Sequence, residues 1–291
     1  MVSNEVTPAA LLGAQEWVQM RDGRMLHAQV LPGPGSGPSV VFEAGSGADR
    51  SSWAAVQPGV SRFARAVVYD RAGLGRSQPD PGGRTLERMA DDLNDLLDHF
   101  TPGPFILVGH SAGGPIVRLA AARHPERIAG LVLVDPTDEA APVLFTRRFR
   151  AGERTALAAA AALSRLGLLR HSFGWLLRAA PEGVRADLQR EAFTPGVIRT
   201  QREQARTFLD ELRAWQRRPP DLGEIPVTVV SGAVPGHGMS RAVRAQANAA
   251  HATRAAASAR GRHVIAERSG HYVPVSDPEV IVDEIRRMLA A

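Results

Sequence analysis

The feature that most restricts the fold is a repeated alternation of short apolar runs with longer helical patterns. Most of the apolar runs are continuous, which is typical of strands buried on both faces of a parallel sheet. Strands that alternate with helices predict an α/β fold, in which helices cover both faces of a mostly parallel sheet. Eight runs are expected to be strands: Glu16–Met20, Arg24–Leu31, Ser39–Phe42, Ala66–Tyr69, Phe105–Val108, Leu131–Val134, Val227–Val230 and His263–Ala266.

Turn and cap signals support this division of the chain. Asp22-Gly23 separates the first two runs and predicts a hairpin. Asp277 and Pro278 predict the N-cap and the first turn of a C-terminal helix. Four helical patterns accompany the strands, at Arg84–Phe100, Ala112–Arg123, Arg241–Ala257 and Pro278–Leu289.

The alternation is interrupted once, after Leu131–Val134, by a long segment rich in Ala, Leu and Arg without a clear strand. Within it, Thr155–Leu169 and Arg199–Arg217 have helical periodicity and propensity. We therefore expect a helical insertion that packs over one edge of the sheet as a lid. The predicted division is a core of residues 1–135 and 224–291 and a helical cap of residues 136–223.

The charge of the chain does not indicate a nucleic-acid partner. All 35 basic residues are arginine, and the formal net charge is +5. Residues 136–223 hold 15 Arg against 10 Asp and Glu, whereas the rest of the chain is balanced, so the whole excess lies in the predicted cap. Aromatic residues make up only 5 % of the chain, which leaves few platforms for stacking bases. We interpret the arginines as solvated helix faces.

Several other classes are disfavoured by composition. The absence of Cys excludes disulfides, a thiol nucleophile and thiolate metal sites, and no H-E-x-x-H pattern occurs, so neither a metal nor a cofactor is predicted. The longest uncharged apolar stretch, around Ala156–Leu163, is much shorter than the ~20 residues that a membrane span needs. Met1–Val6 contains no signal-peptide pattern. We expect a soluble cytoplasmic protein without a membrane partner.

The strongest local pattern is Gly109-His110-Ser111-Ala112-Gly113, which follows an apolar strand and opens a helix. This is the context that the G-x-S-x-G motif of a nucleophilic serine requires. The flanking glycines let the neighbouring backbone pass a strained turn without Cβ clashes. The turn would hold the Ser111 hydroxyl at a helix N-terminus, where developing negative charge is favoured.

Together with three further segments, this motif resembles the α/β-hydrolase family. The segments are Val41–Gly47, Tyr69–Ser77 and Ser269-Gly270-His271, and they occur in the order and spacing of that family. The resemblance covers essentially the whole chain outside the insertion. It implies an α/β-hydrolase fold, with a mostly parallel eight-stranded sheet flanked by helices, and a serine nucleophile at Ser111.

A serine hydroxyl needs a base to take its proton, and His271 is the best candidate among nine histidines. Its place after the last strand and before the C-terminal helix resembles the position of the base in the family. His263 lies within a strand and is expected to be structural, and His110 is expected to point away from the serine. His251 and His237 remain open as alternatives.

The usual acid of the family follows the seventh strand, but no Asp or Glu occurs between Ile225 and Ala266. In some members the acid follows the sixth strand, where this chain has Asp135. Asp135 is therefore predicted to fix the tautomer of the base and to stabilise its charge. Asp138 is the second candidate.

The resemblance assigns the oxyanion-stabilising donors to the backbone N–H groups of Ser46 and Ala112. Glu43-Ala44-Gly45 stands where many relatives have a His-Gly pair. We expect Glu43 to brace this loop rather than to act in the chemistry. Asp70 and Arg71 are expected to hold the loop after the fourth strand.

These residues predict hydrolysis of a carboxylic ester or lactone, with a small-molecule substrate of apolar character. Epoxide and halide chemistry is disfavoured because relatives with those activities use an aspartate in place of Ser111. An iminopeptidase-like peptidase, a carbon–carbon bond hydrolase, an acyltransferase and a non-catalytic ligand receptor remain alternatives, and homo-oligomers remain open. The insertion also supplies apolar residues that could line a pocket, although no individual role is assigned to them. They are Leu144, Phe145, Leu157, Leu163, Leu166, Leu168, Leu169, Phe173, Trp175 and Leu176.

Overall fold

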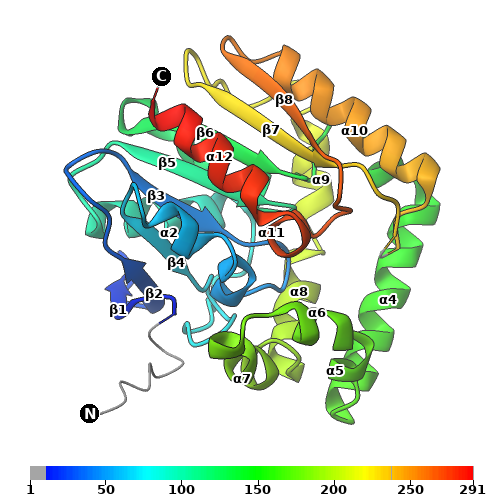
Figure 1. Cartoon of the computed structure of the whole chain (residues 1–291). Coiled ribbons are helices and arrows are strands. Elements are labelled where there is room, and N and C mark those ends of the chain that lie inside the picture. Colours follow the sequence, from blue (N-terminus) through cyan, green and yellow to red (C-terminus); the bar gives the residue numbers. More distant parts are fainter. Residues whose placement is uncertain (1–10, 237, 291) are drawn as a thin grey trace, which may run out of the picture.

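A computed structural model describes residues 11–236 and 238–290. Eight strands form one sheet in the order β1-β2-β4-β3-β5-β6-β7-β8 (Figure 1). β2 pairs antiparallel with β1 and β4, and all other neighbours are parallel. The predicted mostly parallel eight-stranded sheet is confirmed. The strands are β1 (Ala14–Gln19), β2 (Met25–Leu31), β3 (Ser39–Glu43), β4 (Ala66–Tyr69), β5 (Phe105–His110), β6 (Ile128–Val134), β7 (Val227–Gly232) and β8 (Gly261–Ala266).

Successive residues of the strands pack into separate cores on the two faces of the sheet, as the two-residue period of a strand requires. In β5, Leu107 belongs to the core formed with α2 and α3, whereas Ile106 and Val108 belong to the core formed with α1 and α12. Continuous apolar runs were therefore the correct signal for these strands. The helices are α1 (Gln57–Val60), α2 (Leu86–His99), α3 (Gly113–Arg123), α10 (Arg241–Ala256) and α12 (Pro278–Leu289).

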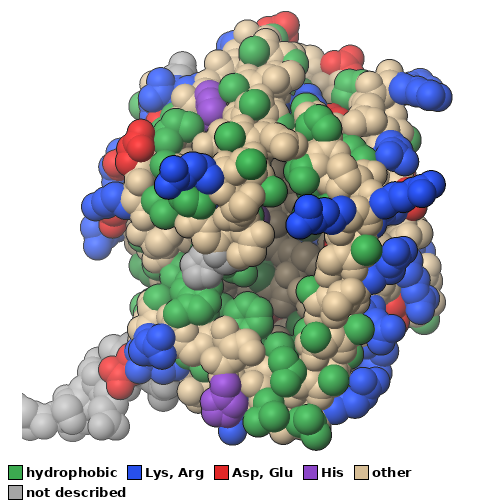
Figure 2. Space-filling view, turned by 90° about the vertical axis from the view of Figure 1, so that its right-hand side faces the viewer, with side chains coloured by type: hydrophobic (Ala, Val, Ile, Leu, Met, Phe, Trp, Pro, Cys, Tyr) green, Lys and Arg blue, Asp and Glu red, His purple; other side chains and the backbone are tan. Residues whose placement is uncertain are grey.

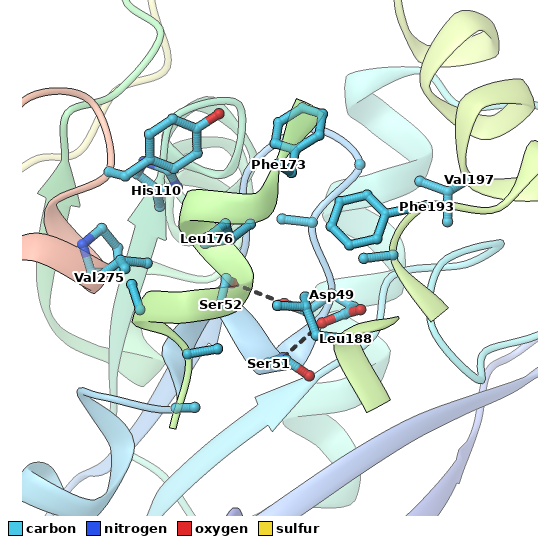
Figure 3. A pocket seen from close by; sticks show the side chains of 18 of the residues that line it. Asp49, Ser51, Ser52, His110, Phe173, Leu176, Leu188, Phe193, Val197 and Val275 are labelled. Atoms are coloured by element: carbon cyan, nitrogen blue, oxygen red, sulfur yellow. Dashed lines mark hydrogen bonds between the residues drawn. The ribbon is translucent and has the colours of Figure 1, made fainter. Parts of the chain in front are cut away.

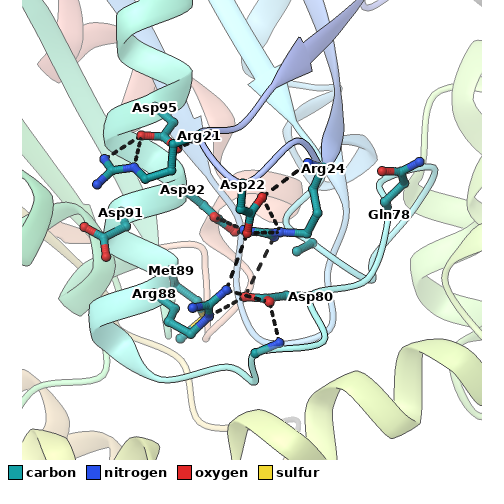
Figure 4. Close-up of polar contacts among 12 residues, drawn as sticks. Arg21, Asp22, Arg24, Gln78, Asp80, Arg88, Met89, Asp91, Asp92 and Asp95 are labelled. Carbon is teal, nitrogen blue, oxygen red and sulfur yellow. Dashed lines mark hydrogen bonds and ion pairs between the residues drawn. The ribbon is translucent and has the colours of Figure 1, made fainter.

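An ion-pair network joins the β1–β2 hairpin to α2 (Figure 4). Arg24, which directly precedes β2, donates to the carboxylates of Asp22 and Asp92. Its Nη2 lies 2.6 Å from Oδ1 of Asp92. Arg88 of α2 donates to Asp80 through Nε at 2.6 Å. The side chain of Arg24 is only 10 % exposed, so this arginine serves internal pairing rather than a charged surface.

The segment between β6 and β7 contains helices and, in the described residues, no strand. Its helix α6 contacts α11 (Val273–Ser276), and its helix α7 contacts η2 (Arg50–Trp53). Because η2 follows β3 and α11 follows β8, the segment lies over the carboxyl ends of the strands (Figure 1). The division into core and cap at residues 136 and 223 stays a prediction. The helices are η4 (Pro142–Phe145), α4 (Arg147–Arg165), α5 (Leu169–Ser172), α6 (Gly174–Ala179), α7 (Glu182–Glu191), α8 (Pro195–Gln204) and α9 (Phe208–Ala214).

Three helix predictions differ from the structure. The helix predicted at Thr155–Leu169 begins at Arg147, because the Thr146 hydroxyl accepts the Phe149 N–H at 3.2 Å and caps an earlier turn. The pattern over 199–217 forms two helices, α8 and α9, because i→i−3 hydrogen bonds tighten and end α8 after Gln204. Asp277 does occupy the N-cap position of α12, but its carboxylate makes no cap bond and instead accepts Arg268 Nη2 at 2.5 Å.

The space-filling view shows a face that is hollowed near its centre, with hydrophobic side chains near the hollow and arginines both beside it and along the edges of the view (Figure 2). In the described part of the chain, no helix has the length and apolar character that crossing a bilayer requires. The Met1–Val6 segment, on which the signal-peptide prediction rests, lies outside the described residues.

Candidate active site

Ser111 lies on the turn that leads from β5 into α3, with a positive φ of 52°. Such a backbone conformation is rare for a residue with a side chain and is typical of strained functional turns. The neighbouring positions have no room for a side chain and therefore need glycine. A Cβ at Gly109 would lie 2.6 Å from the Gly113 carbonyl oxygen, and a Cβ at Gly113 would lie 2.6 Å from that of Glu43. The strand–turn–helix context expected of the motif is therefore present.

His271 contacts both Ser111 and Asp135. Its Nε2 lies 3.1 Å from Ser111 Oγ, and its Nδ1 lies 2.6 Å from Asp135 Oδ2. The two distances allow Nδ1–H to donate to the carboxylate while Nε2 accepts from the hydroxyl. The side chain of His271 is 26 % exposed, so the hydroxyl–imidazole pair is open to a ligand. The structure thus brings together three side chains from the ends of β5, β6 and β8.

Asp135 directly follows β6 with a positive φ of 41°, and its carboxylate lies towards β7. The Gly232 N–H donates to Asp135 Oδ1 at 3.0 Å, and Arg244 of α10 donates to both oxygens, with Nη2–Oδ2 at 3.0 Å. Burial opposes ionisation, but the hydrogen bond from His271 and the contacts with Arg244 outweigh it and hold the pKa of Asp135 well below its usual range.

Arg244 is a site residue that the sequence reasoning missed. It is 3 % exposed, and 109 residues separate it from Asp135. A signal was present, because the stretch from Ile225 to Ala266 contains arginines but no carboxylate. A buried arginine in such a stretch needs a partner from elsewhere in the chain.

Asp138, the second candidate for the acid, belongs to a different cluster. Its carboxylate accepts Arg254 Nε at 2.9 Å and the Ala140 N–H at 2.9 Å, and it lies 3.5 Å from Arg118 Nη1. Arg118 also donates to Glu139 at 2.7 Å. Among the described residues, the carboxylate of Asp138 thus has its hydrogen-bond partners in this cluster and not at His271.

His110 turns away from the Ser111 hydroxyl, as expected. Its Nε2–H donates to the backbone carbonyl of His271 at 2.9 Å, so it supports the loop that carries the imidazole. Burial, with the adjacent His271 adding to it, lowers the pKa of His110 to about 3. His110 is therefore neutral over the physiological pH range.

The other histidines considered as the base lie elsewhere. His251 and His263 both contact Ser231 Oγ, at 2.7 and 2.8 Å, and His251 Nε2–H donates to the Pro136 carbonyl at 2.8 Å. Burial lowers the pKa of both imidazoles. These contacts agree with structural roles. His237 lies outside the described residues.

The loop after β3 lies against the Ser111 turn. A Cβ at Gly45 would lie 3.3 Å from Ser111 Cβ and 3.1 Å from His110 Nδ1, so any side chain here would press on the Ser111 turn. Among the described residues, neither the Ser46 nor the Ala112 N–H donates to a protein acceptor. Both predicted oxyanion donors therefore remain available to a ligand, although their catalytic role stays a prediction.

Arg71 holds this loop in place. Its Nη2 donates to the Gly45 carbonyl at 2.6 Å, and its Nη1 donates to the Ala44 carbonyl and to the Glu43 carboxylate. Tyr69 O–H donates to the other oxygen of Glu43, which is fully buried. The expected bracing by Glu43 agrees with these contacts. Arg71 itself stands in the loop after β4, where its carbonyl accepts the Leu74 N–H at 2.9 Å, and its side chain ties this loop to the loop after β3.

Asp70 also contacts the loop after β4. Its Oδ2 accepts the Arg76 N–H at 3.1 Å, and its backbone carbonyl accepts the Ser77 hydroxyl at 2.6 Å. It also accepts Arg50 Nη1 at 2.7 Å and contacts His27 Nδ1 at 3.2 Å. This buried carboxylate is therefore a structural anchor.

Two cavities flank the Ser111 turn, and Ser46 lines both. The larger, of about 170 Å³, reaches from His110 to the helices between β6 and β7 (Figure 3). The smaller, of about 100 Å³, is lined by Ala112, Thr137, Glu153 and Leu144, among others. The larger cavity has an apolar wall, formed by Leu169, Phe173, Leu176, Leu188, Phe193, Val197, Ile198, Pro274 and Val275.

Only some of the apolar residues that the sequence analysis named as pocket candidates line these cavities. Leu169, Phe173 and Leu176 line the larger one, whereas Leu166 and Leu168 are 70 % and 46 % exposed. Within the described residues, no group of three His, Asp or Glu side chains is arranged to hold a metal ion.

Comparisons with known proteins identify the family. Residues 38–173 match the family model of the alpha/beta hydrolase fold. The magnesium-chelatase 30 kDa subunit of Rhodobacter capsulatus is 31 % identical over 224 residues, which are 73 % of this chain and 77 % of the relative. The esterase Rv0045c of Mycobacterium tuberculosis is 29 % identical over 262 residues, 88 % of this chain and 84 % of the relative.

Other matches are shorter or more distant. The match to YqjL of Bacillus subtilis, at 34 % identity, spans 40 % of this chain and less than half, 46 %, of that protein. The solved structure of the epoxide hydrolase CorEH superimposes with a TM-score of 0.72 over 95 % of this chain and 98 % of the other, at 20 % identity, a similarity of fold alone. Fold, motif order and relatives agree with the family expected from the motifs: the chain belongs to the α/β-hydrolase fold family.

Proposed function

We propose that this protein is a serine hydrolase that cleaves a carboxylic ester or lactone through an acyl-enzyme on Ser111. The observation that supports this most is the continuous contact from Ser111 Oγ to His271 Nε2 at 3.1 Å and from His271 Nδ1 to Asp135 Oδ2 at 2.6 Å. Nucleophile, base and orienting carboxylate in this order form the arrangement that acyl transfer by serine requires.

In the first half-reaction, His271 Nε2 takes the proton of the Ser111 hydroxyl while Oγ attacks the carbonyl carbon. The negative charge that develops on the carbonyl oxygen is stabilised by the N–H groups of Ser46 and Ala112. The imidazolium then gives its proton to the leaving alkoxide, and the acyl group stays on Oγ. For a lactone, the alkoxide remains part of the same molecule and becomes its free hydroxyl.

In the second half-reaction, water takes the place of the serine hydroxyl. His271 accepts a proton from water, the hydroxide attacks the acyl carbon, and the proton returns to Ser111 as the carboxylic acid leaves. The Asp135 carboxylate keeps Nδ1 protonated and stabilises the imidazolium in both halves. It remains ionised throughout, because its pKa lies well below its usual range.

The surroundings of Ser111 favour a substrate with an apolar portion. The larger cavity carries Phe173, Leu176 and Phe193 from the helices between β6 and β7. We infer that these helices act as a cap, which removes the reacting groups from bulk water and binds the apolar portion. The similarity to an enzyme named an esterase, over 88 % of this chain, supports the same substrate class.

A fluorophosphonate probe tests the nucleophile without knowledge of the substrate. Intact-mass analysis should find one adduct on the wild-type chain and none on Ser111→Ala, with both proteins folded by circular dichroism. A panel of ester and lactone substrates, followed by pH-stat titration, should then give turnover that Ser111→Ala lacks. A folded wild-type protein without adduct and without turnover would overturn the proposal and favour the ligand-receptor alternative.

A further inference from the structure

One end of the larger cavity is polar although most of its wall is apolar. Asp49 and Ser51 line the cavity together with Leu188 and Phe193, and their side chains lie among its lining residues in Figure 3. Asp49 is 2 % exposed and Ser51 is 7 % exposed. Neither residue contacts Ser111 or His271, and the mechanism above uses neither of them.

Asp49 is the N-cap residue of η2, and this role uses only one of its two carboxylate oxygens. Oδ1 accepts the Ser51 N–H at 2.8 Å and so caps η2. Oδ2 is buried and has no hydrogen-bond partner among the described residues. An N-cap needs a single acceptor, which Asn or Ser supplies equally well, so the second oxygen has no structural explanation.

The Ser51 hydroxyl is in the same situation. Its Oγ is also buried and without a partner in the described part of the chain. Buried polar groups are almost always hydrogen-bonded, and each exception calls for a cause. Two such groups, one a carboxylate oxygen and one a hydroxyl, line the same cavity and are separated by one residue in sequence.

Among the described contacts, the adjacent arginine donates no hydrogen bond to the Asp49 carboxylate. Arg50 directs its guanidinium to Gln29, Asp70 and Glu191, at 2.6 to 2.7 Å. Burial, with the charge of Asp70 adding to it, raises the pKa of Asp49 to about 6. At neutral pH the free oxygen therefore belongs to a carboxylate, which is a strong hydrogen-bond acceptor.

We propose that Asp49 and Ser51 bind a hydroxyl group at the far end of an otherwise apolar substrate chain. A hydroxyl matches both groups, because it donates to Asp49 Oδ2 and accepts from the Ser51 O–H. The apolar wall binds the intervening methylene groups. This inference rests on the proposed hydrolase function and narrows its substrate class to esters or lactones of hydroxylated aliphatic acids.

Binding to the Ser111→Ala variant tests the inference without turnover. The probes are methyl esters of straight-chain acids of six to ten carbons and their ω-hydroxy counterparts, measured by titration calorimetry. We expect at least one chain length at which the hydroxy ester binds about tenfold more tightly, since a hydrogen bond to a charged group exceeds the cost of desolvating the hydroxyl. Asp49→Asn in the same background keeps the cap and should reduce this preference to less than threefold.

Two further variants provide controls. Ser51→Ala should also weaken the preference. Ser52→Ala should preserve it, because Ser52 lines the same cavity but its hydroxyl already donates to the Asp49 carbonyl at 2.8 Å. Thermal unfolding of each variant checks that the cavity is intact.

The outcomes separate this inference from the proposed function. Equal affinity for both ester series, no binding of either, an unchanged preference in a folded Asp49→Asn variant, or tighter binding of ω-amino esters would each overturn the hydroxyl site. A preference that depends on Asp49 in a protein whose wild-type form hydrolyses no ester would support the hydroxyl site while refuting the hydrolase.

Discussion

Replacing Arg244 by Met tests how the unusual partner of Asp135 sets the pH range of activity. Arg244 Nη2 and His271 Nδ1 both contact Asp135 Oδ2, at 3.0 and 2.6 Å. The guanidinium therefore competes with the imidazole for the carboxylate. It also places a permanent positive charge beside the base at the stage when the base becomes positive itself.

The size of this effect follows from the geometry. Arg244 Nη2 and His271 Nδ1 lie at most about 5.6 Å apart, because both contact Asp135 Oδ2, at 3.0 and 2.6 Å. At an effective dielectric constant of about 20, two positive charges at that distance repel by about 3 kcal/mol. One pH unit corresponds to about 1.4 kcal/mol, so the full repulsion equals about two units. Because solvent and the freed carboxylate would relax, we expect a movement of about 1 to 2 pH units.

The direction of the pH shift depends on which protonation state of the base the arginine disfavours. Arg244 opposes the protonated, inactive form of the base, so its removal should make protonation easier. The acid limb of kcat/KM should then move to higher pH in Arg244→Met, measured with the best ester of the panel. The variant should also be less stable by about 3 kcal/mol in urea unfolding, because it removes one partner of a buried ion pair.

Arg254→Met is the matched control. Arg254 lies on the same helix, about 15 Å further along its axis, and pairs with Asp138 and Glu139 instead of Asp135. It should lose stability without moving the acid limb. An unmoved limb in Arg244→Met, or an equal movement in Arg254→Met, would refute the electrostatic reasoning.

Three further predictions concern the site. Asp135→Asn should lower kcat by about 10³–10⁴-fold while Asp138→Asn stays within about tenfold, by steady-state kinetics; the reverse ranking would make Asp138 the acid. Glu43→Gln should lower kcat about tenfold with little change in KM, because it loosens the loop that Arg71 holds, and an unchanged kcat would show that the brace is dispensable. The pKa of His110 falls from 6.5 to about 3 on folding, so the unfolded chain binds more protons between these values. Stability should therefore decrease by about 1.4 kcal/mol for each pH unit below about 6, and His110→Gln should have a flatter pH dependence in urea unfolding, contradicted by parallel curves.

The parts of the fold that the sequence predicted are those with a local signal. Continuous apolar runs located six of the strands, and the hairpin signal at Asp22-Gly23 located the first two. The glycines around Ser111 located the turn that carries it. The helices between β6 and β7 were placed less well, because their start and end depend on a few local hydrogen bonds. The Thr146 hydroxyl moved the start of α4 towards the N-terminus of the chain by eight residues relative to the prediction.

Residues that act across long sequence separations were not predictable in the same way. Arg71 contacts the loop at Glu43 and Gly45, and Arg244 contacts Asp135 from a helix 109 residues away. A guanidinium has the same local sequence signature whether it is solvated or buried. Only the fold determines which carboxylate or carbonyl it meets.

The placement of the acid after β6 is explained by what fills the end of β7. A Cβ at Gly232 would lie 2.0 Å from the Gly270 carbonyl oxygen, so the loop that carries His271 packs directly on the last residue of β7. The Gly232 N–H then donates to Asp135 Oδ1 at 3.0 Å, and Arg244 contacts the same carboxylate from α10. The last residue of β7 thus contributes a backbone donor to the carboxylate that follows β6. A carboxylate introduced by substitution at this position would meet the Gly270 backbone and, so close to Asp135, add a second buried negative charge. Gly232 therefore supports the predicted acid in two ways: it leaves room for the loop that carries His271, and its N–H donates to Asp135.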